Sequence, residues 1–313
     1  MLKLRKDYIL DRWVIAASVR AKRPKQYKQK IKAKEPKLCV FCPGNEALTP
    51  PEIGRIEKNN KWVLRWFPNK FPFVEQKGSA KIKTKNKFLT HSSGYGKHEV
   101  IADTNKHNVQ LWDTKKEHIK LLLEVINNRI TALEKLKNIK YVSVFKNHGE
   151  KAGTSIIHSH VQITAISNIP PAIREEITAI KKHKKCPYCN IIKIERKSKR
   201  KCFENKTFLA FAPYASRFNY EVWIFPKRHI KTLNELKDNE MLDLADMLRK
   251  VLRKLKELNL SHNFYLHYSP KKADLHLHIE IAPRIATWAG FEFSSGITIN
   301  SVMPEFAAKF YRN

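Results

Sequence analysis

The interpretation of this sequence starts from one stretch, Gly153-Thr154-Ser155-Ile156-Ile157-His158-Ser159-His160-Val161-Gln162-Ile163. From residue 154 to residue 163 most alternate positions are β-branched or apolar and no Gly or Pro interrupts them, which predicts a strand entered from a glycine turn. Side chains alternate between the two faces of a strand, so His158, His160 and Gln162 are expected on one face. The Gly-Thr-Ser turn before them can offer backbone N–H groups to an anion. An isolated His-x-His also arises by chance, so its meaning depends on the rest of the chain.

The composition indicates a globular protein with anionic partners. The chain has 313 residues, of which 42% are hydrophobic, enough for one large or two medium domains. The formal net charge of +32 suggests phosphorylated small molecules, nucleic acid or a membrane surface as partners. Lysines are scattered through nearly every segment, however, and such surfaces also arise in thermophilic proteins or from compositional bias. The densest basic runs resemble loops rather than helix faces with interleaved aromatics, which disfavours nucleic-acid binding.

The cysteines point to metal binding in a reducing compartment. No apolar run approaches the roughly 20 residues that a membrane span requires, and no signal-peptide core follows the N-terminus, so we expect a cytoplasmic protein without a membrane partner. Four of the five cysteines form two C-x-x-C pairs, Cys39/Cys42 and Cys186/Cys189. In a reducing compartment such pairs are more often metal ligands than disulfides. Cys202 stands alone and is expected to be an unligated thiol.

The two halves of the chain present the same signals in the same order. Each half has a C-x-x-C pair, a Glu followed eight positions later by a His, an amphipathic helix and a His-x-His strand. Matched order and matched spacing indicate an internal duplication, and the segment 168–185, rich in proline and charge, is interpreted as the connection between the halves. The matched features are Cys39/Cys42 and Cys186/Cys189, Glu99/His107 and Glu221/His229, helices over residues 114–137 and 238–258, and His158/His160 and His276/His278.

Each half therefore offers the four ligands of a tetrahedral zinc site, two cysteines and two histidines. Both sites would be closed to water, so the predicted role of the two zinc ions is structural: each would clamp a loop to the sheet. The alternative is that the cysteines are small buried hydrophobic residues without a metal, and this alternative is stronger for the second set. The first set is Cys39, Cys42, His107 and His158, and the second set is Cys186, Cys189, His229 and His276.

If the first histidine of each His-x-His pair binds metal, the second histidine is free. A neutral imidazole near pH 7 can act as a nucleophile or a base. The free histidines are His160, with Gln162 beside it, and His278, with Glu280 at the same offset. Because the halves differ here, only one is expected to carry the chemistry. Other histidines, such as His262, have no comparable context and are expected at the surface.

At these residues the sequence resembles the galactose-1-phosphate uridylyltransferase family, a branch of the histidine-triad superfamily. The resemblance covers essentially the whole chain and implies an α+β fold of two fused histidine-triad-like halves, residues 1–170 and 171–313, with antiparallel sheets flanked by helices. Its specific part is the combination of Asn147-x-Gly149, Gly153-x-Ser155 and His158-x-His160-x-Gln162, because ordinary histidine-triad hydrolases carry a third His where this chain has Gln162.

The resemblance implies a double-displacement reaction. His160 would attack the α-phosphorus of a nucleotide sugar such as UDP-glucose, releasing glucose 1-phosphate and leaving a nucleotidyl-histidine. A second sugar 1-phosphate, such as galactose 1-phosphate, would then accept the UMP group, while Gln162 would donate hydrogen bonds to a phosphoryl oxygen. The expected substrate contacts are Arg20, Arg23, Asn147, Gly153, Thr154 and Ser155 to phosphates, Asn69 and Phe71 to the nucleoside, and Phe291 and Glu292 to the hexose across the interface of a homodimer.

Several positions depart from the family pattern and leave the acceptor open. Ser159 stands where the family usually has Pro, and this H-S-H arrangement resembles the plant-type ADP-glucose phosphorylases of the same family, which also carry two Cys/His zinc sites. Ala286-Thr287 replaces an expected Lys-Phe pair near the hexose contacts. The acceptor can thus be a hexose 1-phosphate or inorganic phosphate. A non-catalytic zinc protein that binds nucleotide or nucleic acid is a further alternative, but it leaves His160 and Gln162 without a role.

Overall fold

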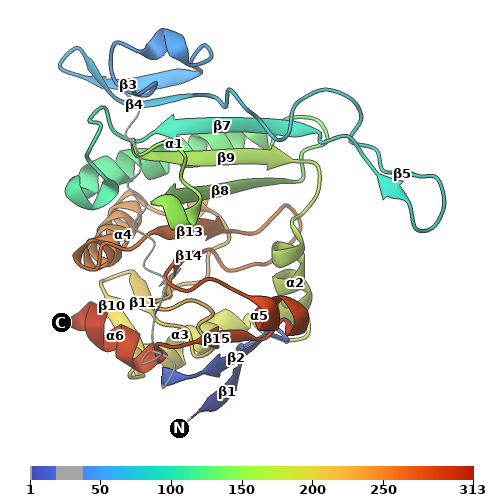
Figure 1. The fold of residues 1–313 in the computed structure, drawn as a ribbon, viewed down its shortest axis with the longest axis vertical. Helices are drawn as coiled ribbons and strands as arrows, with labels where there is room; N and C mark the ends of the chain where they lie inside the picture. The colour runs from blue at the N-terminus through green and yellow to red at the C-terminus, as the bar shows by residue number, and fades with distance from the viewer. Residues whose placement is uncertain (1, 19–37) are drawn as a thin grey trace.

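The computed structural model describes residues 2–18 and 38–313, and its centre is one sheet of ten strands in which all neighbouring strands are antiparallel. Each half of the chain contributes five consecutive strands, and the two sets pair in the middle, where Asn263 lies opposite Asn147 (Figure 1). In spatial order the strands are β10 (Lys201–Glu204), β11 (Phe208–Phe211), β12 (Val222–Pro226), β14 (His278–Pro283), β13 (His262–His267), β8 (Tyr141–His148), β9 (His160–Ile166), β7 (Gly96–Ala102), β4 (Lys61–Pro68) and β3 (Gly54–Lys58).

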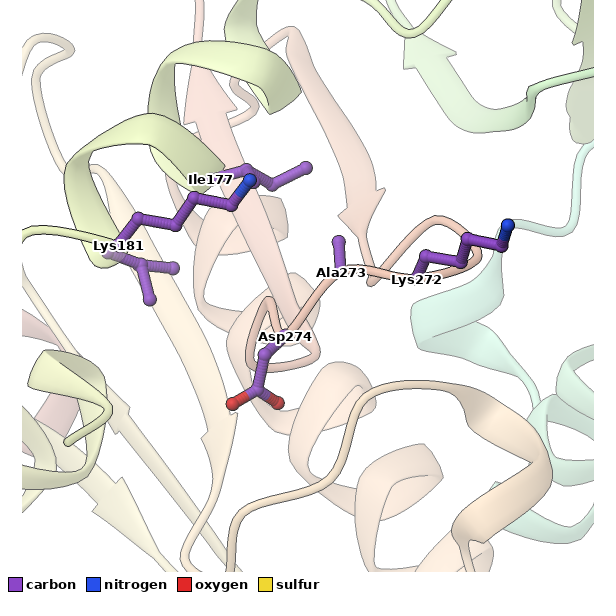
Figure 2. Close-up of a pocket in the computed structure, with 6 residues that line it drawn as sticks. Ile177, Lys181, Lys272, Ala273 and Asp274 are labelled. Atoms are coloured by element: carbon purple, nitrogen blue, oxygen red, sulfur yellow. The ribbon is translucent and has the colours of Figure 1, made fainter. Parts of the chain in front are cut away.

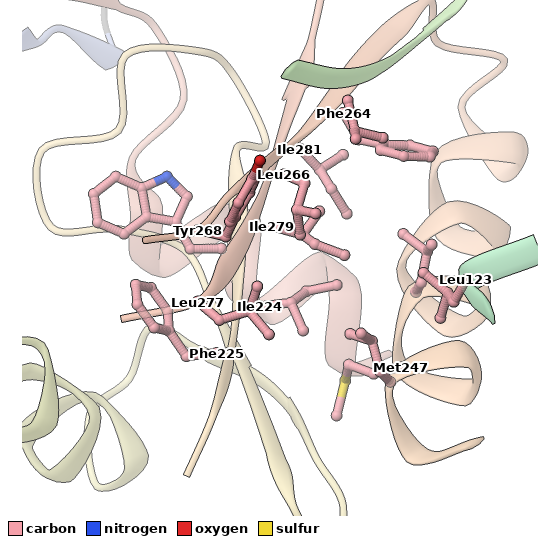
Figure 3. Packing of buried hydrophobic residues seen from close by; sticks show 14 of the residues in the cluster. Leu123, Ile224, Phe225, Met247, Phe264, Leu266, Tyr268, Leu277, Ile279 and Ile281 are labelled. Atoms are coloured by element: carbon pink, nitrogen blue, oxygen red, sulfur yellow. The ribbon is translucent and has the colours of Figure 1, made fainter. Parts of the chain in front are cut away.

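Two long helices, α1 (Lys116–Leu133) and α4 (Asp238–Glu257), cover one face of this sheet and pack against each other. Their apolar residues recur at helical spacing, which places one stripe of each helix against the strands. Figure 3 shows Leu123 of α1 and Met247 of α4 opposite Ile224, Leu266 and Ile279 of the strands, all of them buried. The remaining helices are α2 (Pro171–Ile180), α3 (Pro187–Arg196), α5 (Gly290–Ser295) and α6 (Pro304–Arg312), with short 3-10 turns η2 (Glu46–Leu48), η3 (Leu111–Asp113), η4 (Glu150–Ala152) and η5 (Leu233–Glu235).

Two smaller sheets lie outside this layer. Strands β1 (Lys3–Lys6) and β2 (Trp13–Ala16) pair antiparallel, and β15 (Thr298–Asn300) adds to β2 in parallel, which joins the two ends of the chain. The hairpin of β5 (Lys83–Thr84) and β6 (Thr90–His91) projects from the body of the molecule (Figure 1). In the part of the chain described here, no helix combines the length and the apolar composition that crossing a membrane requires.

The predicted α+β class, with antiparallel strands flanked by helices, is confirmed, and the strands of both halves form one continuous sheet. The division at residue 170 stays a prediction. The strand predicted over 154–163 is wrong at its start, because β9 begins at His160. Gly149 and Gly153 both have positive φ, 80° and 83°, and the N–H of Thr154 donates to the carbonyl of Gly149. The chain therefore turns here, and His158 lies in the loop before the strand.

Candidate active site and metal centres

The four predicted ligands of the first metal site meet, with their ligand atoms within 4.8 Å of one another. His158 Nδ1 lies 3.6 Å from the Sγ atoms of both Cys39 and Cys42, and His107 Nδ1 lies 3.4 Å from Cys42 Sγ. A tetrahedral zinc ion with Zn–S of about 2.3 Å and Zn–N of about 2.0 Å holds S and N roughly 3.6 Å apart. The Nε2–H of His158 donates to the carbonyl of Thr104 at 2.7 Å, which leaves Nδ1 as the ligand atom. These residues therefore fit zinc.

The second set meets in the same way. Its ligand atoms also lie within 4.8 Å of one another. His276 Nδ1 is 3.9 Å from Cys186 Sγ and 3.8 Å from Cys189 Sγ, and His229 Nδ1 is 3.6 Å from Cys189 Sγ. The Nε2 atom of His229 lies 2.9 Å from Asp274 Oδ1, the carboxylate contact that commonly orients a metal-binding histidine. The second set also fits a zinc ion, with slightly longer separations.

His160 begins β9 and is held in one tautomer. Its Nδ1–H donates to the carbonyl of His158 at 2.8 Å, so the lone pair lies on Nε2. The residue is 7% exposed. The rings of Phe41 and His160 pack edge to face, with 5.4 Å between their centroids. Burial lowers the pKa of His160 to about 4, and the nearby charge of Lys146 adds to this effect. The imidazole is therefore neutral at pH 7, the form that a nucleophile requires.

The amide of Gln162 is held by His98, a buried residue that the sequence analysis did not select. His98 Nε2 lies 2.9 Å from Gln162 Oε1 and 3.2 Å from Asn69 Nδ2. The Oδ1 atom of Asn69 accepts the backbone N–H of Phe71 at 2.9 Å. With the proton on Nε2, His98 donates to Gln162 Oε1 and makes no hydrogen bond with the NH₂ group of Asn69. This leaves the Gln162 NH₂ group for another acceptor. Strand alternation alone puts His98 and Val100 on one face of β7, but only the pairing of Val100 with Gln162 in the folded sheet brings that face beside Gln162.

Other predicted phosphate contacts border this face. The β8–β9 register pairs Phe145 with Gln162, and its continuation sets Asn147 opposite His160. The Oδ1 atom of Asn147 accepts a hydrogen bond from Asn263 Nδ2 at 2.8 Å, which ties the site to the other half of the chain. Behind Asn147 the turn contains Gly153 at a positive φ, a conformation that glycine adopts without steric cost, followed by half-buried Thr154 and exposed Ser155.

Among the remaining predicted substrate residues, those that the structure describes do not contact His160 within one chain. Arg20 and Arg23 lie outside the described residues. Phe71 is 83% exposed. Phe291 and Glu292 belong to α5, which packs against β15 and lies away from β9 (Figure 1). Their predicted contact with the hexose across a homodimer interface stays a prediction.

His278 occupies the position of His160 in the second half but has a different environment. Its Nδ1–H donates to the carbonyl of His276 at 2.9 Å, which repeats the tautomer of His160. Its Nε2 atom, however, faces Glu176 and Glu280 at 3.7 Å each, and the residue is 1% exposed. His267 Nδ1 lies 2.7 Å from Glu176. The four side chains bring their nitrogen and oxygen atoms close enough to hold a metal ion.

The expectation that His262 lies at the surface is wrong, because it is 1% exposed. Its strand, β13, is a central strand of the sheet, where His262 lies opposite His148. The two rings stack at 4.9 Å, and the Nδ1–H of His262 donates to the carbonyl of Leu260 at 3.0 Å. Cys202, like His262, is buried, and the expectation that its thiol has no ligand stays a prediction.

Two hollows accompany these groups. The larger, of about 410 Å³, is lined by residues 72–75, 77–78 and 93–94, and the ring of Phe73 in its wall lies 4.4 Å from His98. The smaller, of about 190 Å³, lies between α2 and the loop 272–274. Figure 2 shows Lys181, Lys272 and Asp274 around it. Because Asp274 contacts His229, the smaller hollow adjoins the second metal set, and the larger one adjoins the His98–Gln162 pair.

Comparisons with known proteins agree with this arrangement. The family model Galactose-1-phosphate uridyl transferase, N-terminal domain, matches residues 2–170, and a Domain of unknown function (DUF4921) matches residues 96–309. An ADP-glucose phosphorylase of Arabidopsis thaliana is 33% identical over 99% of this chain and 92% of its own length. A galactose-1-phosphate uridylyltransferase of Thermotoga maritima is 30% identical over 99% of this chain and 97% of its own length.

The structural comparison extends over the same length. The crystal structure of an ADP-glucose phosphorylase from Arabidopsis thaliana with bound ADP-glucose covers 100% of this chain and 99% of its own, with a TM-score of 0.85 and 30% sequence identity. The similarity thus spans both halves of the chain. A family model that matches more than half of the chain, together with relatives similar over their full length, shows that this protein belongs to the galactose-1-phosphate uridylyltransferase family.

Proposed function

We propose that the protein is a nucleotidyltransferase that moves a nucleotidyl group from a nucleotide sugar to a hexose 1-phosphate through a covalent intermediate on His160. The nucleotidyl group that we propose is UMP. The observation that supports this most is the state of the His160 imidazole. It is neutral, its Nδ1–H is engaged by the carbonyl of His158 at 2.8 Å, and its lone pair lies on Nε2. Within residues 2–18 and 38–313, no side chain hydrogen-bonds to that Nε2 atom.

In the first step the Nε2 lone pair of His160 forms a bond to the α-phosphorus, and the bond from that phosphorus to the bridging oxygen breaks. The sugar 1-phosphate leaves with the electron pair. The Nδ1 proton remains on the ring, where the His158 carbonyl stabilises the positive imidazolium. In the second step a phosphate oxygen of the acceptor attacks the same phosphorus, the N–P bond breaks and the neutral imidazole returns. No proton is gained or lost over the cycle.

Positioning and hydrogen bonding by neutral groups account for the rest of the chemistry. The NH₂ group of Gln162, oriented by His98, is proposed to donate to a phosphoryl oxygen. A neutral amide cannot deprotonate water, so the intermediate would persist until an acceptor arrives. Each of the two Cys₂His₂ sets would hold a structural zinc ion. The first would fasten the loop around Cys39 to the sheet, and the second would fasten the start of α3 to it. Phe291 and Glu292 would reach the site from a second copy, and light scattering that finds a dimer would support this.

A second candidate reaction is phosphorolysis, with inorganic phosphate as the acceptor and a nucleoside diphosphate as the product. The similarity to an ADP-glucose phosphorylase over both full lengths favours it, as does Ser159 between the two histidines. The covalent step on His160 is the same in both reactions. Only the group that attacks the nucleotidyl-histidine differs.

The test is to incubate the protein with UDP-glucose or ADP-glucose labelled at the α-phosphate and to analyse the denatured protein. We expect an acid-labile, base-stable label that is absent from His160→Ala and retained in the matched second-half variant His278→Asn. Absence of label with both nucleotides, or its persistence in His160→Ala, would refute the proposal. Adding galactose 1-phosphate, glucose 1-phosphate or phosphate to the labelled protein then identifies the acceptor, because only the true acceptor discharges the label rapidly.

A further inference from the structure

A lysine side chain is buried beneath the proposed nucleophile. Lys146 on β8 is 2% exposed, and by strand alternation it points to the face opposite Asn147, where α1 packs. Its Nζ lies 2.7 Å from Asp103 Oδ2, 2.7 Å from Ser159 Oγ and 3.0 Å from the carbonyl oxygen of His160. An ammonium group has three N–H donors, so all three are used.

The three acceptors belong to the segments that set the position of His160. Asp103 follows the end of β7, and its backbone N–H donates to the carbonyl of Ser159 at 3.2 Å. The next residue, Thr104, accepts the hydrogen bond from the metal-binding His158. Ser159 links the metal ligand to the nucleophile. The ammonium therefore ties together the end of β7, the residue between the two histidines and the backbone of His160 itself.

Stability alone does not account for a lysine at this position. Burying an ammonium is unfavourable unless it is paired and hydrogen-bonded, and replacing a whole buried ion pair by apolar side chains of similar size is often neutral or stabilising. The charge also sits under a site that handles phosphates, behind the strand rather than in contact with solvent. Its contacts are all to the nucleophile segment and to the strand end that this segment meets.

We propose that Lys146 is a positioning residue for His160. By holding the His160 carbonyl and the Ser159 hydroxyl, it fixes the first residue of β9 so that the Nε2 lone pair keeps the direction needed for in-line attack. Attack geometry is sensitive to displacements of this size, since a shift of about 1 Å can cost about 100-fold in rate. The inference rests on the proposed function and assigns a role to a residue that does not itself touch the substrate.

The first test compares Lys146→Met with Arg129→Met. Arg129 is a matched control because its guanidinium pairs with the buried Glu99 carboxylate of β7, at 2.8 Å for both hydrogen bonds, on the same face of the sheet. Both variants remove a cation from a buried carboxylate and should lose similar thermal stability. In single-turnover experiments on folded protein, Lys146→Met should form the nucleotidyl-enzyme about 10- to 100-fold more slowly, with the Kd for the nucleotide sugar within about threefold of wild type. Arg129→Met should keep the wild-type rate.

A double-mutant cycle separates positioning from a general structural effect. Ser159→Ala should slow the same step by about two- to tenfold, and in a Lys146→Met background it should have no further effect, because the hydroxyl acts through the ammonium. Losses that multiply would overturn the inference. So would a wild-type rate in Lys146→Met, or parallel losses of rate in both the lysine and the arginine variants.

A readout that needs no turnover keeps this inference separate from the proposed function. In protein labelled with ¹⁵N-histidine, the Nδ1–H of His160 should give a hydrogen-bonded signal that shifts or exchanges faster in Lys146→Met and is unchanged in Arg129→Met. An unchanged signal in Lys146→Met overturns the positioning role even if the wild type forms no nucleotidyl-enzyme. A changed signal in a protein that never becomes labelled supports the positioning role and rejects the proposed reaction.

Discussion

The stacked pair of the half-buried His148 and the buried His262 should make the protein lose stability in mild acid. The two rings stack at 4.9 Å between neighbouring strands, and Trp112 lies 4.6 Å from the ring of His148. Burial lowers the pKa of His148 to about 4, with Lys146 adding to the effect and Asp103 opposing it. Burial and the charge of His148 lower the pKa of His262 to about 3. Both imidazoles are therefore neutral in the folded protein over most of the accessible pH range.

The size of the effect follows from proton linkage. In the unfolded chain each histidine titrates near its ordinary pKa of about 6.5. Above that pH the two histidines do not lower the free energy of unfolding. As the pH drops below it, the free energy of unfolding decreases until the pH reaches the folded pKa values. At pH 5 each histidine lowers the free energy of unfolding by about 2 kcal/mol. This is because pH 5 lies about 1.5 units below the unfolded pKa, and each unit is equivalent to about 1.36 kcal/mol. The pair together costs about 4 kcal/mol. The result depends little on the folded pKa values, because both lie below 5.

The assay is urea unfolding of the wild type and His262→Phe at pH 8 and pH 5. Phenylalanine keeps the stacked ring and removes the proton-binding nitrogen, so the free energy of unfolding of the variant minus that of wild type should be about 2 kcal/mol larger at pH 5 than at pH 8, which means a relative gain in stability for the variant. Acid loss of metal affects both proteins and cancels in this difference. The exposed His91 provides the control His91→Phe, for which the difference should be near zero. The same pH dependence in wild type and His262→Phe would refute the reasoning.

Three further predictions concern the site. His98→Phe removes the donor that orients Gln162, so kcat should fall about 10- to 100-fold, equivalent to about 1.5–3 kcal/mol for one hydrogen bond to charge, while KM changes little; an unchanged kcat would exclude this role. Gln162→Glu places a carboxylate beside the phosphates and should slow nucleotidyl-enzyme formation more than Gln162→Ala does, with equal rates contradicting the electrostatic argument. Cys42→Ser and Cys189→Ser should each reduce the metal content by about one zinc per chain, but only Cys42→Ser should also abolish labelling; a full metal content in either variant would remove that site.

The parts of the site that could be predicted from the sequence are those whose chemistry is local or repeated. Two C-x-x-C pairs, two His-x-His segments and two matched Glu/His spacings together indicate all eight ligand candidates, because the duplication presents the same set of four in each half. The role of His98 and the burial of His262 could not be predicted, for the same physical reason. Their roles depend on which strands become neighbours, β7 with β9 and β13 with β8, and no local pattern specifies such long-range pairing. Side-chain alternation does not locate the start of β9, because positive φ at two glycines determines where that strand begins.

The two halves share one hydrogen bond, made by the second histidine of His-x-His, but the surroundings of that histidine differ. In both, the second histidine of His-x-His donates its Nδ1–H to the carbonyl of the first histidine, the candidate metal ligand, so both present Nε2 as a lone pair. What differs is the set of groups around that atom. Two carboxylates face Nε2 of His278, and they in turn contact His267 and Arg217. A phosphate would have to displace this buried network to reach the lone pair. Near His160 the side chain at the corresponding offset is the neutral amide of Gln162, and the closest buried cation lies beneath the strand. The groups next to the second histidine, more than the histidine itself, therefore distinguish the half that we propose to carry the phosphoryl chemistry from the other half.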